Sequence, residues 1–177
     1  MNIRPQAGFT LIELLFTLAV AAILSMIALP SFKRVLAHNR VIQTDNQLIG
    51  ALNFARSQAV THGVAVILCP SSDGSRCAPG QSWQGGWLVG QDGDHDFQPD
   101  AAPQRVFAGF PRDIRIHSSR GRLRVRYRPD GSSPGSNLSL IVCRAGQPET
   151  ARSVVVSNAG RIRQGTASPA QAQACSG

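Results

Sequence analysis

The feature that most constrains this chain is an apolar run near its N-terminus. Between Phe9 and Phe32 the only ionisable residue is Glu13. As a helix that rises about 1.5 Å per residue, the run reaches roughly 36 Å, which is enough to cross the hydrocarbon core of a bilayer. A carboxylate one turn into such a helix costs about 2.5–3.5 kcal/mol on insertion scales, so we expect Glu13 to meet a partner charge. The run therefore predicts a membrane-spanning helix.

An ordinary signal peptide or membrane anchor is the alternative for this run. A short leader that contains Arg4 precedes the apolar residues, as it does in a signal peptide. A signal peptide is cut after its apolar region at a small-residue site, and no A-x-A pattern stands out near Leu29 and Pro30. The helical pattern continues instead, which counts against a cleaved signal.

The start of the run, Gly-Phe-Thr-Leu-Ile-Glu at residues 8–13, resembles the N-terminus of type IV pilins and type II secretion pseudopilins. This resemblance implies that a membrane prepilin peptidase cuts after Gly8 and that the new N-terminal Phe9 is N-methylated. It also implies that Glu13 pairs with the freed α-amino group of Phe9 in a neighbouring subunit during filament assembly. In lipid, an acid and an amine that are each costly alone can neutralise one another.

The resemblance implies a pilin-like α+β fold, in which a long N-terminal membrane-spanning helix packs on a C-terminal antiparallel β domain of two sheets. We expect a leader at residues 1–8, a helix at 9–62 and a periplasmic β domain with a flexible C-terminal tail at 63–177. Within the helix, residues 9–32 form the membrane and assembly part, and residues 33–62 form an amphipathic part. The protein would cross the bacterial inner membrane once and then join a pilus or pseudopilus.

The amphipathic part has four apolar residues on one helical face, namely Leu48, Leu52, Ala55 and Ala59. Polar residues, among them Asp45 and Arg56, lie largely elsewhere around the helix. Gly63 follows as a stop signal after about His62. This apolar face should therefore pack on the β domain.

Beyond the helix, short apolar segments alternate with Gly, Pro, Asp and Ser at turn positions, which is typical of strands. The expected strands are residues 64–69, 86–90, 105–110, 114–116, 123–128, 138–143 and 153–157. Segments 55–60, 86–89 and 157–161 narrow the resemblance to the FimT/GspH group of minor pilins and pseudopilins. The tail after Gly165 is rich in Ala, Gln and Ser and is expected to be loosely ordered.

Four cysteines lie beyond the membrane run, and an even count in an exported domain favours disulfides. Three connectivities exist for Cys69, Cys77, Cys143 and Cys175. We expect Cys69–Cys77, because this pair brackets a Gly/Ser/Pro turn, and Cys143–Cys175, which would tie the tail to a strand. A zinc site is the alternative, but the chain has no C-x2-C pair.

The chain is strongly basic, with a formal net charge of +8 and a pI of about 10.9. Of its 18 basic residues only Lys33 is a lysine. Arginine carries a planar fork of donors that suits phosphate, although high-GC coding bias would also enrich it. Basic charge favours attraction to a negative surface or a polyanion.

Arginines alternate with apolar residues between Arg120 and Arg128. In a strand, Arg122, Arg124, Arg126 and Arg128 would project from one face, while the residues between them point to the core. From Arg120 onward the row would run roughly 26 Å at about 3.3 Å per residue. It predicts either contact with a nucleic acid backbone or a solvated face whose arginine stems cover apolar surface.

A shorter version of this pattern is Gly160-Arg161-Ile162-Arg163, which follows a valine-rich strand. In the FimT group, a glycine-arginine-x-arginine element is associated with DNA binding during natural transformation, and these residues match it. The resemblance implies that Arg161 and Arg163 contact phosphates with little sequence readout. A β-turn with solvated charges is the alternative.

The acidic cluster at residues 92–96, followed by Asp100, reads as a polar hairpin loop. Calcium binding is the alternative, but the spacing lacks the pattern of an EF-hand loop. Trp83 and Trp87 are expected to fill core or loop contacts, and stacking on nucleic-acid bases is the alternative. No nucleophile motif organises the Ser, His and Asp residues, so we expect neither catalysis nor a cofactor.

Three hypotheses remain. The favoured one is a FimT-like minor type IV pilin that supports pilus assembly and binds DNA for uptake, with other pilins, the prepilin peptidase, the inner membrane and DNA as partners. The second is a GspH-like minor pseudopilin of a type II secretion system. A membrane-anchored enzyme is the third, and no motif supports it.

Overall fold

The computed structural model describes residues 10–110, 113–135 and 137–176. Gly8 and Phe9, at which processing is expected, lie outside the described residues, as does the leader. The chain divides into two compact units, Met1–His38 and Asn39–Gly177. Helix α1 (Leu11–His62) contributes residues to both units.

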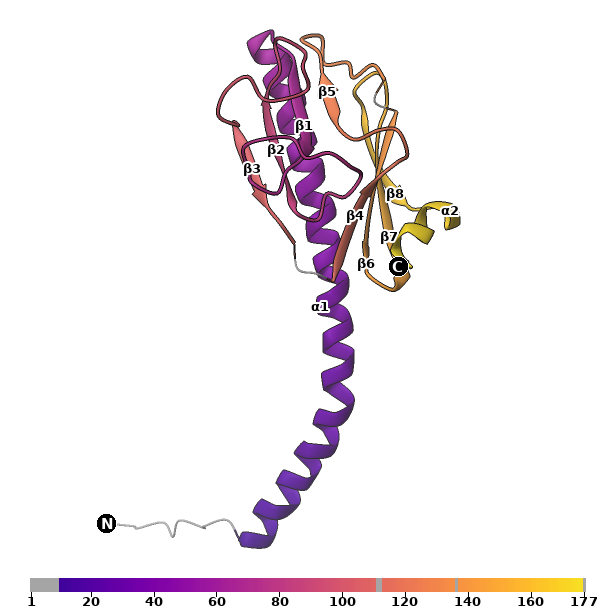
Figure 1. The fold of residues 1–177 in the computed structure, drawn as a ribbon. Coiled ribbons are helices and arrows are strands. Elements are labelled where there is room, and N and C mark those ends of the chain that lie inside the picture. The colour runs from indigo at the N-terminus through magenta and orange to yellow at the C-terminus, as the bar shows by residue number, and fades with distance from the viewer. Residues whose placement is uncertain (1–9, 111–112, 136, 177) are drawn as a thin grey trace, which may run out of the picture. The chain divides into compact units, whose positions relative to one another are not determined.

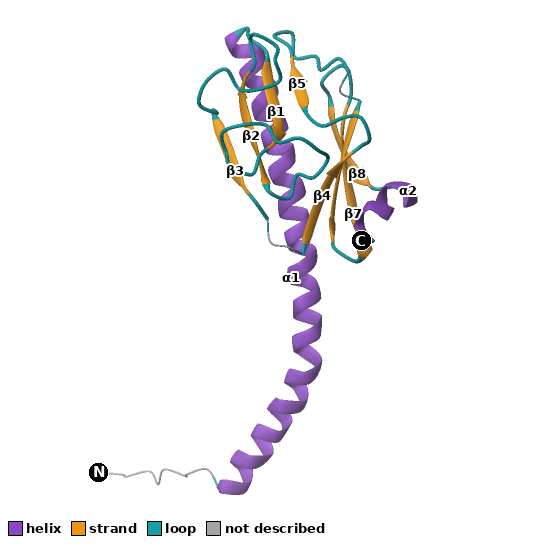
Figure 2. Cartoon of the chain, in the orientation of Figure 1, coloured by secondary structure: helices purple, strands orange, loops and turns teal. Residues whose placement is uncertain are grey.

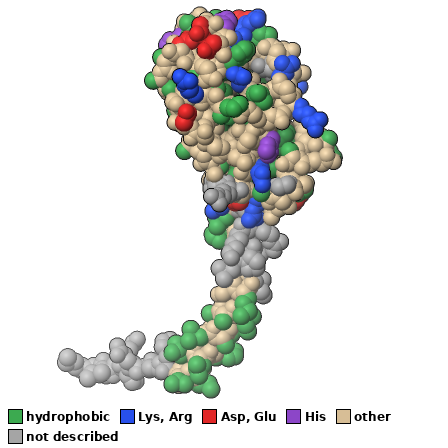
Figure 3. Space-filling model, viewed as in Figure 1, with side chains coloured by type: hydrophobic (Ala, Val, Ile, Leu, Met, Phe, Trp, Pro, Cys, Tyr) green, Lys and Arg blue, Asp and Glu red, His purple; other side chains and the backbone are tan. Residues whose placement is uncertain are grey.

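In the first unit, α1 is covered by exposed apolar side chains, including Leu11, Phe16 and Leu24. Figure 3 shows hydrophobic side chains gathered along the described part of the helix nearest the N-terminus. At the start of α1, the Glu13 backbone N–H donates to the Thr10 hydroxyl over 3.3 Å. Within the described part of the chain, no helix combines the length and the apolarity that crossing a membrane requires. The membrane-spanning role of residues 9–32 therefore stays a prediction.

In the second unit, α1 ends as its sequence predicts. The four residues of the apolar face are fully buried in the main core, namely Leu48, Leu52, Ala55 and Ala59. The helix stops at His62, and Gly63 adopts a φ of +66° while its N–H donates to the Ala59 carbonyl. A left-handed residue after the last turn is the usual glycine cap of a helix. Asp45, however, is fully buried, which corrects its expected position away from the packed face.

The β domain consists of two antiparallel four-stranded sheets, seen beside α1 in Figures 1 and 2. The first sheet has the order β3-β2-β1-β5, with β3 (Arg105–Ala108), β2 (Gly86–Gln91), β1 (Val66–Pro70) and β5 (Val125–Tyr127). The second has the order β4-β6-β7-β8, with β4 (Ile114–Ser118), β6 (Leu138–Arg144), β7 (Gln147–Val156) and β8 (Ile162–Thr166). The two expected sheets are confirmed.

The core contains both tryptophans. Trp83 and Trp87 are fully buried, and the ring of Trp87 stacks on Phe107 and Phe110 with centroid distances of 5.5 and 5.1 Å. This confirms their interpretation as core residues rather than platforms for bases.

Both expected disulfides are present, Cys69–Cys77 and Cys143–Cys175. The second joins β6 to a short segment formed by helix α2 (Pro169–Ala172) and the 3-10 helix η1 (Gln173–Cys175). Where the composition predicts a loosely ordered tail, the chain instead completes β8 and then forms these helical turns. The covalent link to β6 and the burial of Cys175 explain the difference, because residue composition does not register either constraint.

Candidate nucleic-acid interface

The Gly160–Arg163 element forms the turn and first residues of the β7–β8 hairpin. The Gly160 N–H donates to the Ser157 carbonyl over 2.8 Å, and the Ser157 N–H donates to the Arg161 carbonyl over 3.0 Å. Ile162 then pairs with Val156 and packs against the main core. The side chains of Arg161 and Arg163 are exposed. The extended run, with its isoleucine inward and its arginines outward, therefore follows the sequence pattern.

Gly160 itself is buried and lies close to a second glycine. Its φ is +72°, and an added Cβ would overlap the Gly131 carbonyl oxygen and lie 3.1 Å from the Gly131 carbonyl carbon. The same Cβ would lie 3.3 Å from Nε of Arg56, which donates to the Gly131 carbonyl over 3.0 Å. Gly160 is therefore a packing residue that lets the hairpin approach Arg56, rather than a contact residue for a ligand.

This approach leaves a groove of about 420 Å³ between α1 and β8. We call it the α1–β8 groove; its lining residues are Ile49, Asn53, Arg56, Arg161, Ile162, Arg163 and Gln164. The groove brings a half-buried arginine from α1 together with two exposed arginines of the β7–β8 hairpin. Sequence reasoning did not select Arg56 for this site. The i, i+4, i+7 spacing of Ile49, Asn53 and Arg56 was the one available signal, because it places them on one face of the helix.

Beside the groove, an ion pair joins α1 to β7 and a hydrogen bond joins α1 to β8. Asp45, fully buried on α1, accepts from Arg152 Nε over 2.9 Å and also from the side-chain amide of Gln164. Arg152 stands on β7 and pairs in register with Thr166 of β8. A charge-assisted pair of this kind fixes orientation more than it adds net stability. It explains why this acid is buried although its sequence position predicts exposure.

The arginine row from Arg120 to Arg128 is not one continuous ladder, which corrects the sequence expectation. Only Val125–Tyr127 pairs as a strand. Upstream, the Arg122 N–H donates to the Ser119 carbonyl over 3.1 Å, and Gly121 has a φ of +74°, so Arg120 sits in a turn. The strict alternation holds for Val125, Arg126 and Tyr127, where only the arginine is partly exposed.

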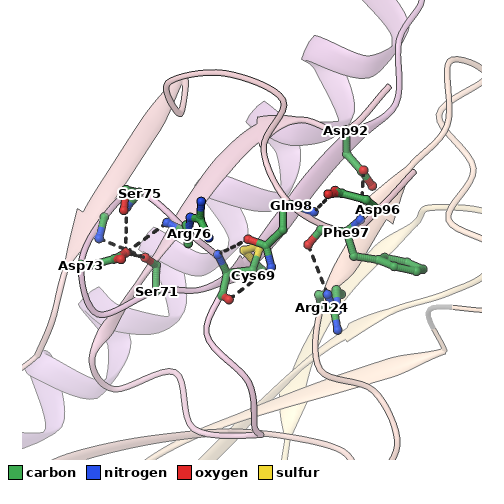
Figure 4. Close-up of a disulfide and its surroundings, with 12 residues drawn as sticks. Cys69, Ser71, Asp73, Ser75, Arg76, Asp92, Asp96, Phe97, Gln98 and Arg124 are labelled. Atoms are coloured by element: carbon green, nitrogen blue, oxygen red, sulfur yellow. Dashed lines mark hydrogen bonds between the residues drawn. A yellow bond between two sulfur atoms is a disulfide. The ribbon is translucent and has the colours of Figure 1, made fainter. Parts of the chain in front are cut away.

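Two arginines of the row are engaged by the loop between β2 and β3. The guanidinium carbons of Arg124 and Arg126 lie 4.8 and 4.6 Å from the ring centroid of Phe97. Arg124 also donates to the Phe97 carbonyl over 3.2 Å, as Figure 4 shows, and Arg126 lies 3.6 Å from Asp92. These contacts hold both guanidinium groups against the loop, and Asp92 offsets part of the charge of Arg126, so a phosphate must compete with them.

The remaining arginines of the row are divided between surfaces. Arg122 lines a hollow of about 320 Å³ together with Arg124, Arg126 and Phe97. Arg120 lines a different hollow, which it shares with residues of α2 and η1. Arg128 is exposed just after β5. The structure thus assembles Arg56, Arg161 and Arg163 around one groove. It gathers three arginines of the row around another hollow but places Arg120 and Arg128 outside it.

The acidic loop connects β2 to β3, in agreement with a polar hairpin loop. Carboxylate oxygens of Asp92, Asp94 and Asp100 lie within 4.8 Å of one another. They also serve the loop itself: Asp92 accepts from the Phe97 N–H over 3.1 Å and Asp100 from the Gly93 N–H over 2.7 Å. Burial raises the pKa of the Asp92 carboxyl, against the opposing effects of the Phe97 N–H and Arg126. Asp92 and Asp100 therefore have a structural role in the loop, as acceptors for its backbone N–H groups.

Comparison with known proteins places the chain in a family. The profile of the family described as "Type II transport protein GspH" matches residues 45–160, and that of the "Prokaryotic N-terminal methylation motif" matches residues 3–29. The chain therefore belongs to the GspH family of pilin-like and pseudopilin proteins. Such proteins are structural components, not enzymes.

Two solved structures share the fold. Both are of the type IV minor pilin FimU from Pseudomonas aeruginosa strain PAO1, in space groups P21 and P65. The first has a TM-score of 0.59 at 22% identity, over 71% of this chain and 87% of that one. The second has a TM-score of 0.54 at 22% identity, over 67% and 87%. These similarities show a pilin-like α+β fold. Among curated protein sequences, none matches the chain.

Proposed function

We propose that the chain is a FimT-like minor type IV pilin that takes part in pilus assembly and binds DNA without sequence preference for uptake during natural transformation. Residues 9–32 would hold it in the inner membrane as a single pass, with the β domain in the periplasm. After cleavage at Gly8 and methylation of Phe9, Glu13 would direct its association with other pilins. The methylation motif at residues 3–29 supports this processing.

The observation that supports DNA binding is the arginine cluster of the α1–β8 groove. Arg161, just before β8, and Arg163, on β8, stand two residues apart, are exposed, and share the groove with Arg56. Guanidinium groups bind phosphate oxygens through paired donors, and such contacts carry affinity without reading bases. The net charge of +8 favours the approach of a polyanion.

The full chain in nonionic detergent micelles provides the test. Fluorescence anisotropy with a labelled duplex, measured over a range of salt concentrations, should show binding at low salt that is independent of sequence. Arg161→Gln with Arg163→Gln should weaken binding and reduce the slope of log affinity against log salt by about 1.8. The matched control is Arg76→Gln with Arg105→Gln, which removes the same charge from two other exposed positions.

Equal losses in the two double variants would mean that only net charge matters, and would remove Arg161 and Arg163 from the mechanism. No binding by the wild-type chain at low salt would favour the second candidate, a GspH-like minor pseudopilin that acts as an assembly component of a type II secretion system. The description of the matching family is the observation that favours that candidate.

A further inference from the structure

We infer that Arg56 is a third phosphate ligand and that the α1–β8 groove binds the phosphodiester backbone rather than the bases. This inference rests on the proposed DNA binding and specifies its site. Arg56 lies on α1, more than 100 residues before Arg161 and Arg163, and belongs to no arginine-rich segment. It shares the groove lining with both of them.

Arg56 is held in place before any ligand arrives. Its Nε donates to the Gly131 carbonyl over 3.0 Å, and Gly131 and Gly160 adopt φ values of +75° and +72° that bring their backbones against it. Among the described hydrogen bonds, none involves the two terminal nitrogens of Arg56. A guanidinium whose stem is already fixed loses less conformational entropy when it binds, so its remaining donors are preorganised for an anion.

The chemistry of the lining selects the ligand. Among the described residues that line the groove, three are arginines and none carries a carboxylate or an aromatic ring. Asp45 is occupied by Arg152 and Gln164 rather than by the groove arginines. Without a ring on which a base could stack, affinity must come from phosphate contacts, so single-stranded and duplex DNA of one length should both bind and both respond to salt.

Arg56→Gln tests the inference in the full chain in micelles, with the same duplex and salt range. We expect affinity to fall on the order of tenfold, as for the loss of one charge-assisted hydrogen bond, and the salt slope to fall by about 0.9. Arg76→Gln removes the same charge at an exposed position outside the groove and should change the affinity much less. Thermal unfolding of both variants shows whether the domain remains folded.

A second variant avoids the structural contact of Arg56. Asn53 is exposed in the groove lining and makes no side-chain hydrogen bond among the described residues, so Asn53→Glu should place a carboxylate beside the arginines without disturbing the fold. Asn39→Glu makes the same change on the same helix, about 21 Å away along its axis. We expect Asn53→Glu to weaken binding severalfold and Asn39→Glu to leave it unchanged.

The outcomes separate the two proposals. Loss of affinity in Arg56→Gln and Asn53→Glu, but not in their controls, supports Arg56 as a ligand. If Arg161→Gln with Arg163→Gln weakens binding while Arg56→Gln and Asn53→Glu bind like wild type, the role of Arg56 is overturned and the proposed function stands. If the wild-type chain fails to bind at low salt, the proposed function fails and the inference fails with it.

Discussion

The close approach of Gly160 to Gly131 makes Gly160→Ala a quantitative test of how the groove is built. A non-glycine residue at a φ of +72° costs roughly 1–2 kcal/mol. The added Cβ would also overlap the Gly131 carbonyl oxygen and lie 3.1 Å from the carbonyl carbon. Because these atoms are backbone, they cannot rotate away, and overpacking of this kind costs about 1–3 kcal/mol. The expected loss of stability is therefore about 2–5 kcal/mol.

Gly146→Ala is the matched control. Gly146 has a φ of +71°, but a Cβ added there meets nothing within 4 Å. It should cost only the backbone penalty, about 1–2 kcal/mol. Alanine also restricts the unfolded chain, but it does so equally at both positions, so that effect cancels in the comparison. The difference between the variants, about 1–3 kcal/mol, isolates the contact between the two glycine backbones.

Urea unfolding under oxidising conditions measures both variants. Trp83 and Trp87 are fully buried in the main core, so their fluorescence reports unfolding of the β domain. Gly160→Ala should have the lower midpoint and should also bind DNA more weakly, because the hairpin must move away from Arg56. Equal midpoints for the two variants would refute the reasoning, since the packing of Gly160 would then contribute nothing beyond its φ.

Three further predictions concern other parts of the chain. Glu13→Ala should leave membrane insertion intact but reduce the amount of the protein in sheared filaments; normal incorporation would count against charge pairing. Burial raises the pKa of Asp92, so the folded state holds this proton more tightly than the unfolded state does. The wild type should therefore lose stability as the pH rises from about 4 through this higher pKa, and Asp92→Asn should lack this loss. The melting temperature of Asp92→Asn minus that of the wild type should therefore be larger at pH 7 than at pH 3. The same difference at both pH values would contradict this. Replacing Cys143 and Cys175 by serine opens a disulfide spanning 32 residues and should cost about 3.7 kcal/mol in urea unfolding, and a negligible loss would argue against this bond.

The parts of the fold that local periodicity governs were predictable. The apolar face of α1 and its end at His62 follow from a 3.6-residue pattern and a following glycine, and both are observed. Asp45 shows the limit of this reasoning. Its partners Arg152 and Gln164 lie 107 and 119 residues away in sequence, so no local pattern could indicate that they would compensate a buried charge.

The same distinction applies to the arginines. Arg161 and Arg163 were predictable as outward-facing because a hairpin is a local structure whose side chains alternate. The row from Arg120 to Arg128 was predicted as one strand because alternation alone does not reveal the turn at Gly121 or the contact of Phe97 with the row. Arg56 was missed because Arg161 and Arg163, with which it shares the groove, lie more than 100 residues further along the sequence.

The number of arginines that contact DNA can be read from the salt dependence. Each phosphate contact contributes about −0.9 to the slope for duplex DNA, so the three arginines of the groove predict a slope near −2.7. If the five arginines from Arg120 to Arg128 contributed fully as well, the slope would approach about −7.2. Arg124 and Arg126 already stack on Phe97, and Arg126 also faces Asp92, so a phosphate must displace these contacts before it gains from them. Without these two arginines the count falls to six and the slope to about −5.4. A slope close to −2.7 would show that the groove alone carries the contacts, and a slope between −5.4 and −7.2 would show that the row also binds DNA.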